Sequence, residues 1–376
     1  MVVRIADFEG RPVSVRVNSV AVDRSPPPIS MSAPEHGEFV HQAFVARALG
    51  SPFVAAVLEA GHRQLARAPR TATLIADWPG DRAAAALAMR FNGALHALAR
   101  RGRPASLCAL YRGEHRDFDD AIGAALEAED AFIAEWMHGP TQTNEVGRAA
   151  AILSALMVVR KALGLPFELL ELGSSSGLNL NLAHYAYDLG GRKAGLPSSP
   201  VRIAPDWRGA APPSAPIEIV AARGVDLQPL DPADEATRER LLSYVWADQP
   251  ERADRLERAL ALAQRHRPRV ERADAISWLA DRLREPQRQG ICRVVFHSMV
   301  LQYLSVADRR TLIEAMARAG AVANAERPLV WIGFEWTADR SEVQLRVSRW
   351  PDGETRHLAT CHPYGDWIDW HGDAPR

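Results

Sequence analysis

The sequence is poor in cysteine, and this scarcity excludes several classes of protein. Its 376 residues include three cysteines, Cys108, Cys292 and Cys361, which lie far apart and form no Cys-x-x-Cys pair. A disulfide scaffold or a zinc ribbon needs closely spaced cysteines, so neither is expected. The common histidine-based zinc patterns and the phosphate-loop pattern are also missing, and we predict no metal site. This cysteine usage fits a reducing compartment and favours a cytoplasmic location.

Long hydrophobic runs and an excess of charge are lacking as well. No stretch of about 18 apolar residues is present and the N-terminus has no hydrophobic signal segment, so neither a membrane span nor a signal peptide is expected. Lys and Arg number 45 against 46 Asp and Glu. That balance gives no electrostatic reason to expect nucleic acid or an anionic membrane as a partner. The length of 376 residues favours two structural regions, and the 47% of hydrophobic residues favours a globular protein.

The first part of the chain is predicted to be helical. Apolar residues recur at three- and four-residue spacing in 41–49, 53–61, 81–102, 121–139 and 145–164. No convincing strand precedes Phe167, so we expect a helical cap region over 31–165. The alternating tract before residue 20 allows a hairpin, but we favour an extension outside the fold over 1–30, with Met31 as the start.

From Phe167 onwards strands alternate with helices. The first five candidate strands, with helices between them, predict an α/β fold with a doubly wound, mainly parallel sheet. A last pair, joined by the turn Pro351-Asp352-Gly353, adds a terminal antiparallel hairpin at the edge. Residues 185–216, rich in Gly and Pro, look like an inserted hairpin or loop. The candidate strands are 167–172, 217–227, 268–273, 292–300, 328–336, 343–350 and 354–361.

The most informative stretch is FELLELGSSSGLNLNL, residues 167–182. It predicts a buried strand, a turn of small residues and a helix. Gly173-x-Ser175-x-Gly177 spells the nucleophile elbow of serine hydrolases, but it also resembles a loop that holds a nucleotide-like ligand. A hydrolase needs several strands before its nucleophile, whereas the region before Phe167 is helical. We therefore favour a ligand loop, with these residues in contact with the ligand: Glu171, Gly173, Ser174, Ser175, Ser176, Gly177 and Asn179.

Polar residues at the ends of the next strands agree with a ligand at this edge. Asp226 ends the second strand, where a carboxylate can accept hydrogen bonds from both ribose hydroxyls. Asp274-Ala275 ends the third strand, where a carboxylate can accept from an adenine amine. His297-Ser298 ends the fourth strand, and His297 is a candidate general base. A core histidine satisfied by hydrogen bonds is the equal alternative for His297.

This set of strand ends resembles the S-adenosylmethionine-dependent methyltransferase fold over about 167–376. The resemblance implies a methyltransferase-like α/β domain over 166–376 with S-adenosylmethionine as cofactor, Asp226 on the ribose and Asp274 on the adenine. Ser174-Ser175 stand where that family has its second glycine. From Met31, the chain more closely resembles an uncharacterised bacterial family, domain of unknown function 2332. The segments that carry this resemblance are QTNEVGR, ELGSSSGLNLN, RGVDLQPLD, LLSYVWADQPER, VVFHSMVLQYL and HPYGDW.

Glu145 and Arg148 open the helix that leads into the first strand. They lie three residues apart and so share a helix face. Arg148 could pair with the carboxylate of a methionine moiety, and Glu145 could bind its ammonium group or act on a substrate amine. The alternative is a helix cap with a surface ion pair.

Four further residues are candidate substrate contacts. Asn144 precedes Glu145, Asp248 and Gln249 follow Trp246, and Tyr364 lies in HPYGDW. A helix-to-helix turn is the alternative for Asp248 and Gln249, and packing at the sheet edge is the alternative for Tyr364.

Three functions remain open at this point. The leading one is methyl transfer from S-adenosylmethionine to a small-molecule or peptide-like acceptor, with the helical region closing over the site as a lid. The second is a serine hydrolase that uses Ser175 with His297. The third is a non-catalytic protein that binds an adenosyl ligand.

Overall fold

The structure is a computed structural model that describes residues 2–6, 12–16, 37–80, 82–83 and 85–372. Its contacts divide the chain into two compact units. The α/β unit consists of Met1–Met31, Glu145–Leu230 and Arg265–Arg376. The helical unit consists of Ser32–Asn144 and Asp231–Gln264. The segment after β8 thus joins the helical unit, although the alternation of strands and helices alone groups it with the sheet.

The helical unit confirms the predicted N-terminal helical region. Pro52 and Pro69 stand in the first turn of their helices, where the missing N–H costs nothing. Asp117 caps α6 by accepting a hydrogen bond from the Asp120 N–H at 3.0 Å. The helices are α1 (Glu38–Ala48), α2 (Pro52–Gln64), η1 (Leu65–Arg67), α3 (Pro69–Ala76), α4 (Leu87–Arg100), α5 (Ala105–Tyr111), α6 (Phe118–His138), α8 (Glu235–Ser243) and α9 (Pro250–Arg265).

The α/β unit is built on a nine-stranded sheet in the order β7-β14-β13-β12-β11-β10-β3-β8-β9. The five strands from β9 to β11 are parallel, and β12, β13 and β14 continue antiparallel. All seven predicted strands are present, so the predicted mainly parallel α/β sheet is confirmed. They are β3 (Phe167–Leu172), β8 (Ile219–Asp226), β9 (Val270–Arg272), β10 (Cys292–Ser298), β11 (Leu329–Trp336), β12 (Val343–Trp350) and β13 (Glu354–Cys361).

The predicted antiparallel pair is not at the edge of the sheet. The short strands β14 (Trp367–Trp370) and β7 (Asp206–Arg208) extend the sheet beyond β13, and β7 pairs parallel to β14. The strand β7 comes from the Gly- and Pro-rich insert. The rest of the insert forms a small sheet of β4 (Ala186–Leu189), β5 (Arg192–Gly195) and β6 (Arg202–Ile203). At three or four residues, β7 and β14 are too short to show a two-residue period clearly.

The predicted α-helix after the glycine loop is a 3-10 helix, η3 (Leu178–His184), so β3 and β8 have no α-helix between them. Two tyrosines explain the tighter winding. The Tyr185 hydroxyl donates to the Leu178 carbonyl, and the Tyr187 hydroxyl donates to the Leu182 carbonyl at 2.7 Å. An α-helix would offer these carbonyls to its own N–H groups four residues later. The tyrosines hold them instead, and the chain turns into β4.

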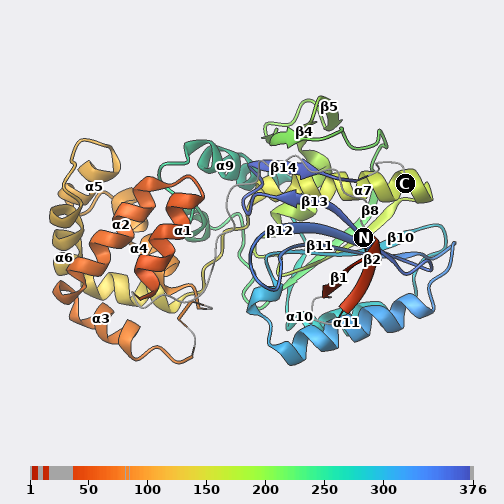
Figure 1. The fold of residues 1–376 in the computed structure, drawn as a ribbon. Helices are drawn as coiled ribbons and strands as arrows, with labels where there is room; N and C mark the ends of the chain where they lie inside the picture. The colour runs from red at the N-terminus through yellow and green to blue at the C-terminus, as the bar shows by residue number, and fades with distance from the viewer. Residues whose placement is uncertain (1, 7–11, 17–36, 81, 84, 373–376) are drawn as a thin grey trace. The chain divides into compact units, whose positions relative to one another are not determined.

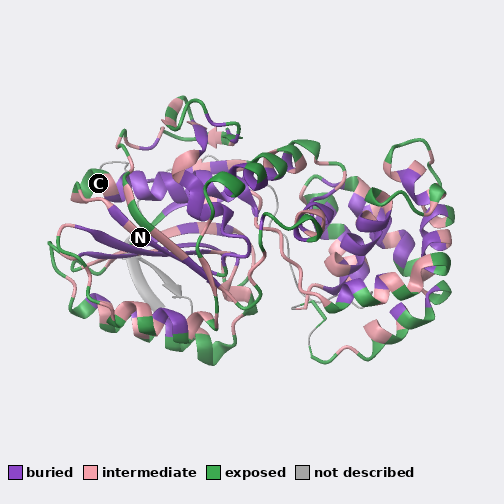
Figure 2. Ribbon diagram, turned by 180° about the vertical axis from the view of Figure 1, so that it is seen from behind, coloured by how far each residue is buried: buried purple, intermediate pink, exposed green. Residues whose placement is uncertain are grey.

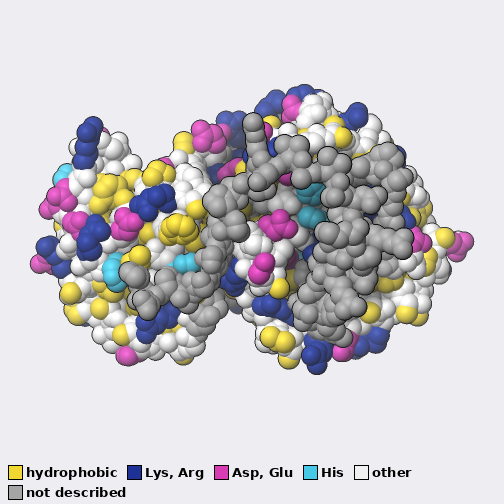
Figure 3. Space-filling view, viewed as in Figure 1, with side chains coloured by type: hydrophobic (Ala, Val, Ile, Leu, Met, Phe, Trp, Pro, Cys, Tyr) yellow, Lys and Arg dark blue, Asp and Glu magenta, His cyan; other side chains and the backbone are white. Residues whose placement is uncertain are grey.

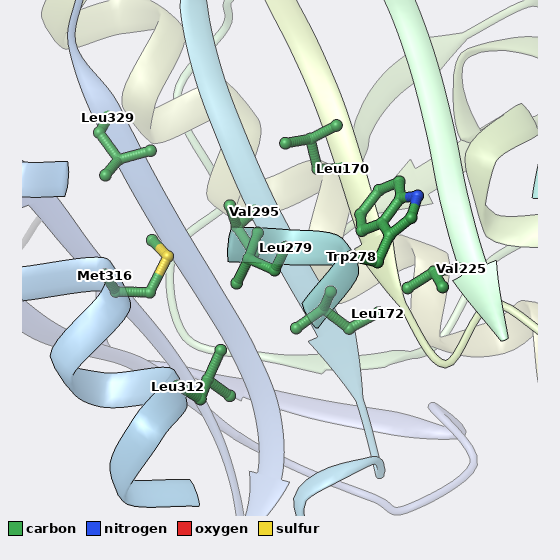
Figure 4. Packing of buried hydrophobic residues seen from close by; sticks show 9 residues of the cluster. All are labelled: Leu170, Leu172, Val225, Trp278, Leu279, Val295, Leu312, Met316 and Leu329. Atoms are coloured by element: carbon green, nitrogen blue, oxygen red, sulfur yellow. The ribbon is translucent and has the colours of Figure 1, made fainter. Parts of the chain in front are cut away.

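Helices cover both faces of the sheet in the α/β unit (Figure 1). The helix α7 (Ala149–Leu163) lies on one face, and α10 (Ala275–Arg284) and α11 (Val306–Ala321) lie on the other. The central strands β3, β10 and β11 and the helix α7 are largely buried (Figure 2). Leu170, Leu172 and Val295 point toward α10 and α11, where they meet Leu279 and Leu312 (Figure 4). Burial of each such side chain stabilises the fold by roughly 1.5–3 kcal/mol.

At the N-terminus, β1 (Val2–Ala6) and β2 (Pro12–Arg16) pair antiparallel in a separate two-stranded sheet. The alternating tract before residue 20 therefore forms a hairpin, which was the less favoured of the two interpretations of this tract. Met31, the proposed start, lies outside the described residues. On the face shown in Figure 3, the described Lys, Arg, Asp and Glu side chains are interspersed.

Candidate functional site

The candidate site lies at the carboxyl ends of the parallel strands. From β3 the chain runs outward to β8 and β9, and it then returns to β10 on the other side of β3. The connections therefore diverge between β3 and β10, which is where open α/β sheets bind ligands. Most of the residues singled out from the sequence follow the ends of β3, β8 and β10.

The loop after β3 has an alternating backbone. Gly173, Ser175 and Gly177 have φ values of 65°, 54° and 72°. Glycine adopts this left-handed region without strain, whereas serine does so at a cost. Ser175 thus takes a glycine-like conformation between the two glycines of the loop. The Ser175 N–H donates to Asp226 Oδ2 at 2.8 Å, which ties the loop to the end of β8.

Neighbouring protein atoms leave no room for a side chain at Gly173 or Gly177. A Cβ on Gly173 would lie 2.6 Å from Val300 Cγ2, and one on Gly177 would lie 2.6 Å from Pro268 Cβ. Ser174 also faces the protein, because its Oγ donates to the Glu171 carbonyl at 3.1 Å. Fewer residues of the loop can therefore contact a ligand than the sequence suggests.

Asp226 is the anchor of this loop. Its Oδ1 accepts from the Gln228 N–H at 2.8 Å, and its Oδ2 holds the Ser175 N–H. Each carboxylate oxygen can accept a second hydrogen bond. The end of β8 therefore carries a carboxylate that is held in a fixed orientation beside the loop.

Asp274 has a structural role at the end of β9. Its Oδ1 accepts from the backbone N–H groups of Ile276 at 3.1 Å and Ser277 at 2.9 Å. It is exposed and is the N-cap of α10, whose first residue is Ala275. The sequence missed this cap. The predicted contact with an adenine amine stays a prediction.

Glu171 is the most unusual group at this edge. It is 2% exposed, and its Oε2 has no hydrogen-bond partner among the described residues. Burial raises the pKa of this carboxyl to about 8, the Ser174 hydroxyl opposes the shift, and the Asp226 carboxylate raises the pKa further. A buried acceptor without a partner costs about 1–3 kcal/mol, so this atom calls for an explanation.

Glu145 lies beside the glycine loop and is the N-cap of η2 (Val146–Arg148), a 3-10 helix. Its Oε1 accepts from the Gly147 N–H at 2.9 Å, and its carbonyl accepts from Asn179 Nδ2 at 3.5 Å. Asn179 Oδ1 is buried without a partner among the described atoms. The capping role that was the alternative for Glu145 is therefore present.

Arg148 is buried, at 7% exposed. Its Nε donates to the Pro363 carbonyl at 2.8 Å, and its Nη1 lies 3.4 Å from the Ser298 carbonyl. The guanidinium also lies over the Phe334 ring at 5.9 Å. The alternative of a surface ion pair is therefore wrong, because a segment far along the chain folds over this arginine.

That segment is the HPYGDW loop between β13 and β14. A Cβ on Gly365 would lie 2.6 Å from the Gly147 carbonyl carbon, so the two backbones touch. His362 Nδ1 lies 3.1 Å from Asp366 Oδ2, and it also accepts from the Tyr364 N–H at 3.4 Å. Tyr364 is half-buried and belongs to the same edge as Arg148.

His297 is a core histidine with both ring nitrogens occupied. It is 1% exposed; Nδ1 lies 2.7 Å from Glu335 Oε1, and Nε2 accepts from the Trp331 indole N–H at 2.9 Å. A base needs a lone pair that faces its substrate. In this arrangement the Nε2 lone pair faces Trp331, so the geometry supports the alternative for His297 rather than the catalytic role. The sequence reasoning missed Glu335, although an acid inside the apolar strand GFEW could have indicated it.

The chain was compared with known protein families, curated proteins and solved structures. Residues 36–370 match the family described as "Uncharacterized protein conserved in bacteria (DUF2332)". The chain belongs to this family. No curated protein and no solved structure matches.

Several segments of the DUF2332 chain that lie far apart in sequence meet at this edge. QTNEVGR contacts ELGSSSGLN through Glu145 and Asn179, and it contacts HPYGDW through Arg148 and Pro363. RGVDLQPLD contacts the glycine loop through Asp226. The motifs picked out from the sequence therefore converge mainly on one region of the α/β unit.

The remaining substrate candidates belong to the helical unit. Asp248 Oδ1 accepts from the Ser51 hydroxyl at 2.5 Å, and its Oδ2 accepts from the Phe53 N–H at 3.1 Å, so Asp248 fixes the start of α2. Gln249 Oε1 accepts from Arg252. Asn144 ends the first segment of the unit with a φ of 41°. Their predicted substrate contacts are not tested by these bonds.

Within the described residues, no group of three or more His, Cys, Asp and Glu side chains could hold a metal ion. No helix there is both long and apolar enough to span a membrane.

Proposed function

We propose that the α/β unit binds S-adenosylmethionine and transfers its methyl group to a small-molecule or peptide-like acceptor. The observation that carries this proposal is the loop after β3. Three alternate residues of this loop lie in the left-handed region, and the middle one, Ser175, is tied to Asp226 at the end of the neighbouring strand. The loop lies at the point where the sheet connections diverge. Doubly wound folds hold nucleotide-like ligands with this combination.

The residues present fit this cofactor in two respects. Glu171 Oε2 and Asn179 Oδ1 are buried acceptors without a partner among the described groups, and a ligand with an ammonium group supplies the donors that they lack. Asp226 would accept from the ribose hydroxyls, and Asp274 from the adenine amine. Arg148 remains the candidate for the carboxylate, although its Nε already donates to Pro363.

The bound cofactor would supply a sulfonium-activated methyl group. The chain itself would contribute orientation, through the loop fixed by Asp226, and a carboxyl at Glu171 that holds its proton at neutral pH. An ammonium group beside Glu171 favours the carboxylate, so cofactor binding should release a proton from this side chain. We do not assign His297 as the base, because Glu335 and Trp331 occupy its nitrogens.

The hydrolase alternative has one observation in its favour. Ser175 is held at a φ of 54°, and nucleophile elbows also strain their serine. Its proposed partner His297 is engaged elsewhere, so no activated serine is expected. The non-catalytic alternative uses the same residues as the methyltransferase and differs only in turnover.

Calorimetry with S-adenosylmethionine and S-adenosylhomocysteine tests the proposal. We expect both to bind, with protons released at pH 7, and Asp226→Ala to weaken binding by about 1–3 kcal/mol. Asp234→Ala is the matched control, because Asp234 also accepts a backbone N–H, from Thr237 at 2.8 Å, but in the helical unit. Absence of heat and of thermal shift at millimolar ligand would refute the proposal. Labelling of Ser175 by a fluorophosphonate would favour the hydrolase, and binding without methyl release to any acceptor would favour the non-catalytic protein.

A further inference from the structure

A small pocket lies on the α11 side of the sheet, at the carboxyl end of β11. Its walls come from β11, α11, the 3-10 helix η4 (Leu301–Tyr303) and the turn at 337–340. Its volume is about 80 Å³, several times the space that one water occupies. None of its lining residues belongs to the glycine loop, so it is a separate feature of the α/β unit.

Part of the pocket lining is apolar. Leu312 and Ile313 of α11 contribute to it, together with Trp331 of β11. Leu312 is fully buried in the core, while Ile313 and Trp331 are half-buried. These residues suit a short aliphatic group.

Arg309 stands on the same pocket with its charge available. Its Nε donates to the Leu304 carbonyl at 3.1 Å, which holds the side chain in place. The adjacent acid is turned away, because Asp308 Oδ2 accepts from the Ser305 hydroxyl at 2.7 Å at the start of α11. The guanidinium can therefore bind an anion in the pocket.

Arg340, on the turn after β11, also lines the pocket beside an acid that is bonded elsewhere. Its φ of 56° is fixed by the turn, in which its N–H donates to the Thr337 carbonyl at 2.8 Å. Asp339 Oδ1 accepts from the hydroxyls of Thr337 at 2.6 Å and Ser341 at 2.8 Å. Among the described side chains, neither Arg340 nor Arg309 has an acid within ion-pair distance.

Glu335 gives the pocket a negative group of fixed orientation. It is 4% exposed, and its Oε1 accepts from His297 Nδ1 at 2.7 Å and from the Val300 N–H at 2.8 Å. The chain of hydrogen bonds from Trp331 through His297 to Glu335 locks this carboxylate. A buried carboxylate that lines a pocket is matched by a cationic ligand group.

We propose that this pocket binds a compact α-amino acid. The carboxylate lies between Arg309 and Arg340, the ammonium group faces Glu335, and a short side chain packs against Leu312 and Trp331. Two positive groups, an acid and apolar side chains line this one pocket, and they match the three parts of such a molecule. The site goes beyond the proposed function, because it needs no S-adenosylmethionine.

The test is calorimetry on the full chain with glycine, alanine and valine, without S-adenosylmethionine. We expect alanine to bind, and Arg309→Gln and Arg340→Gln each to weaken binding about tenfold through the loss of charge-assisted hydrogen bonds. Arg318→Gln is the matched control, because Arg318 lies on the same helix but pairs with Glu314 at 3.5 Å in solvent. Thermal melting shows that each variant is folded.

Two analogues sharpen the assignment. Alanine methyl ester lacks the carboxylate, N-acetylalanine lacks the ammonium group, and neither should bind measurably. Three outcomes overturn the proposal: no heat with any of the three amino acids, unchanged affinity in both arginine variants, or inorganic phosphate binding as tightly as alanine, which would indicate a simple anion site. The outcome is independent of the calorimetry with S-adenosylmethionine, so either proposal can fail alone.

Discussion

The two ends of the parallel strands treat buried charge in opposite ways. Toward the amino ends, Glu168 of β3 pairs with Arg293 of β10 at 2.8 Å, and Arg293 also donates to the carbonyls of Arg282 and Glu285. Toward the carboxyl ends, Glu171 of the same strand β3 is buried with an oxygen that has no partner in the described structure. The first arrangement satisfies its charges within the fold, and the second leaves an acceptor for something else.

This difference indicates where the fold gives up stability. Natural structures leave few buried polar groups without a partner, and those that remain need a reason. Three residues along one strand separate a satisfied acid from an unsatisfied one, so a general shortage of partners does not explain Glu171. The ligand proposed above would supply the partner that this oxygen lacks.

The largest effect is expected from breaking the satisfied end. Arg293→Met removes the closer of the two arginines that pair with Glu168 and leaves it with Arg223 at 3.6 Å. It also removes the donor to the carbonyls of Arg282 and Glu285, so the free energy of unfolding should fall by about 3 kcal/mol. Urea denaturation measures this change. Arg318→Met, which breaks an exposed pair, should change stability by less than about 1 kcal/mol. Equal losses in both variants would contradict the contrast between buried and exposed pairs.

The next effect concerns the unsatisfied end and depends on pH. Because the pKa of Glu171 is raised to about 8 in the folded protein from 4.5, the folded state holds its proton more tightly than the unfolded state. The stability that Glu171 gains by holding its proton is therefore fully present below about pH 4.5 and is lost as pH rises toward 8. Over that range the free energy of unfolding should fall by at most about 1.4 kcal/mol per pH unit. Glu171→Gln should remove this slope, which urea denaturation between pH 5 and 8 measures. Parallel pH profiles for the two proteins would show that Glu171 is not buried as described.

The smallest effect tests how tightly the HPYGDW loop closes on the carboxyl edge. Gly365→Ala places a Cβ 2.6 Å from the Gly147 carbonyl carbon, whereas Gly353→Ala in the β12–β13 turn meets nothing within 4 Å. Both glycines have positive φ, 77° and 67°, so both variants carry a conformational cost of roughly 1–2 kcal/mol. Gly365→Ala should lower the melting temperature further, by the cost of the backbone clash. A similar shift in both variants would mean that the loop does not contact η2.

Regular elements were predictable because their signals are local. The strands of the parallel sheet are apolar runs, and the helices before Leu163 have a clear three- and four-residue spacing. The 3-10 winding of η3 was not predictable, because its carbonyls accept from the hydroxyls of Tyr185, at the end of η3, and Tyr187, in β4.

The site was predictable only in outline. Sequence patterns indicated the glycine loop and Asp226, whose mutual contact the structure contains. They could not reveal that Trp331 and Glu335 bond to the two ring nitrogens of His297, or that Asp248 fixes the start of α2. These partners are far apart in the sequence and meet only in the folded chain.

The helical unit is assembled from two separate stretches of chain, and this has a consequence for its synthesis. A nascent chain that ends at Asn144 contains α1 to α6 but not α8 and α9. At that stage three contacts of the complete fold cannot form. They are the ion pair of Arg100 with Glu239 at 2.6 Å, the contact of His96 with the Ser243 carbonyl at 3.2 Å, and the bond of Asp248 at the start of α2. The ribosome synthesises β3, the glycine loop and β8 before it synthesises α8 and α9, which complete the helical unit. Completion of the first-made unit therefore waits for the strand end that carries Asp226.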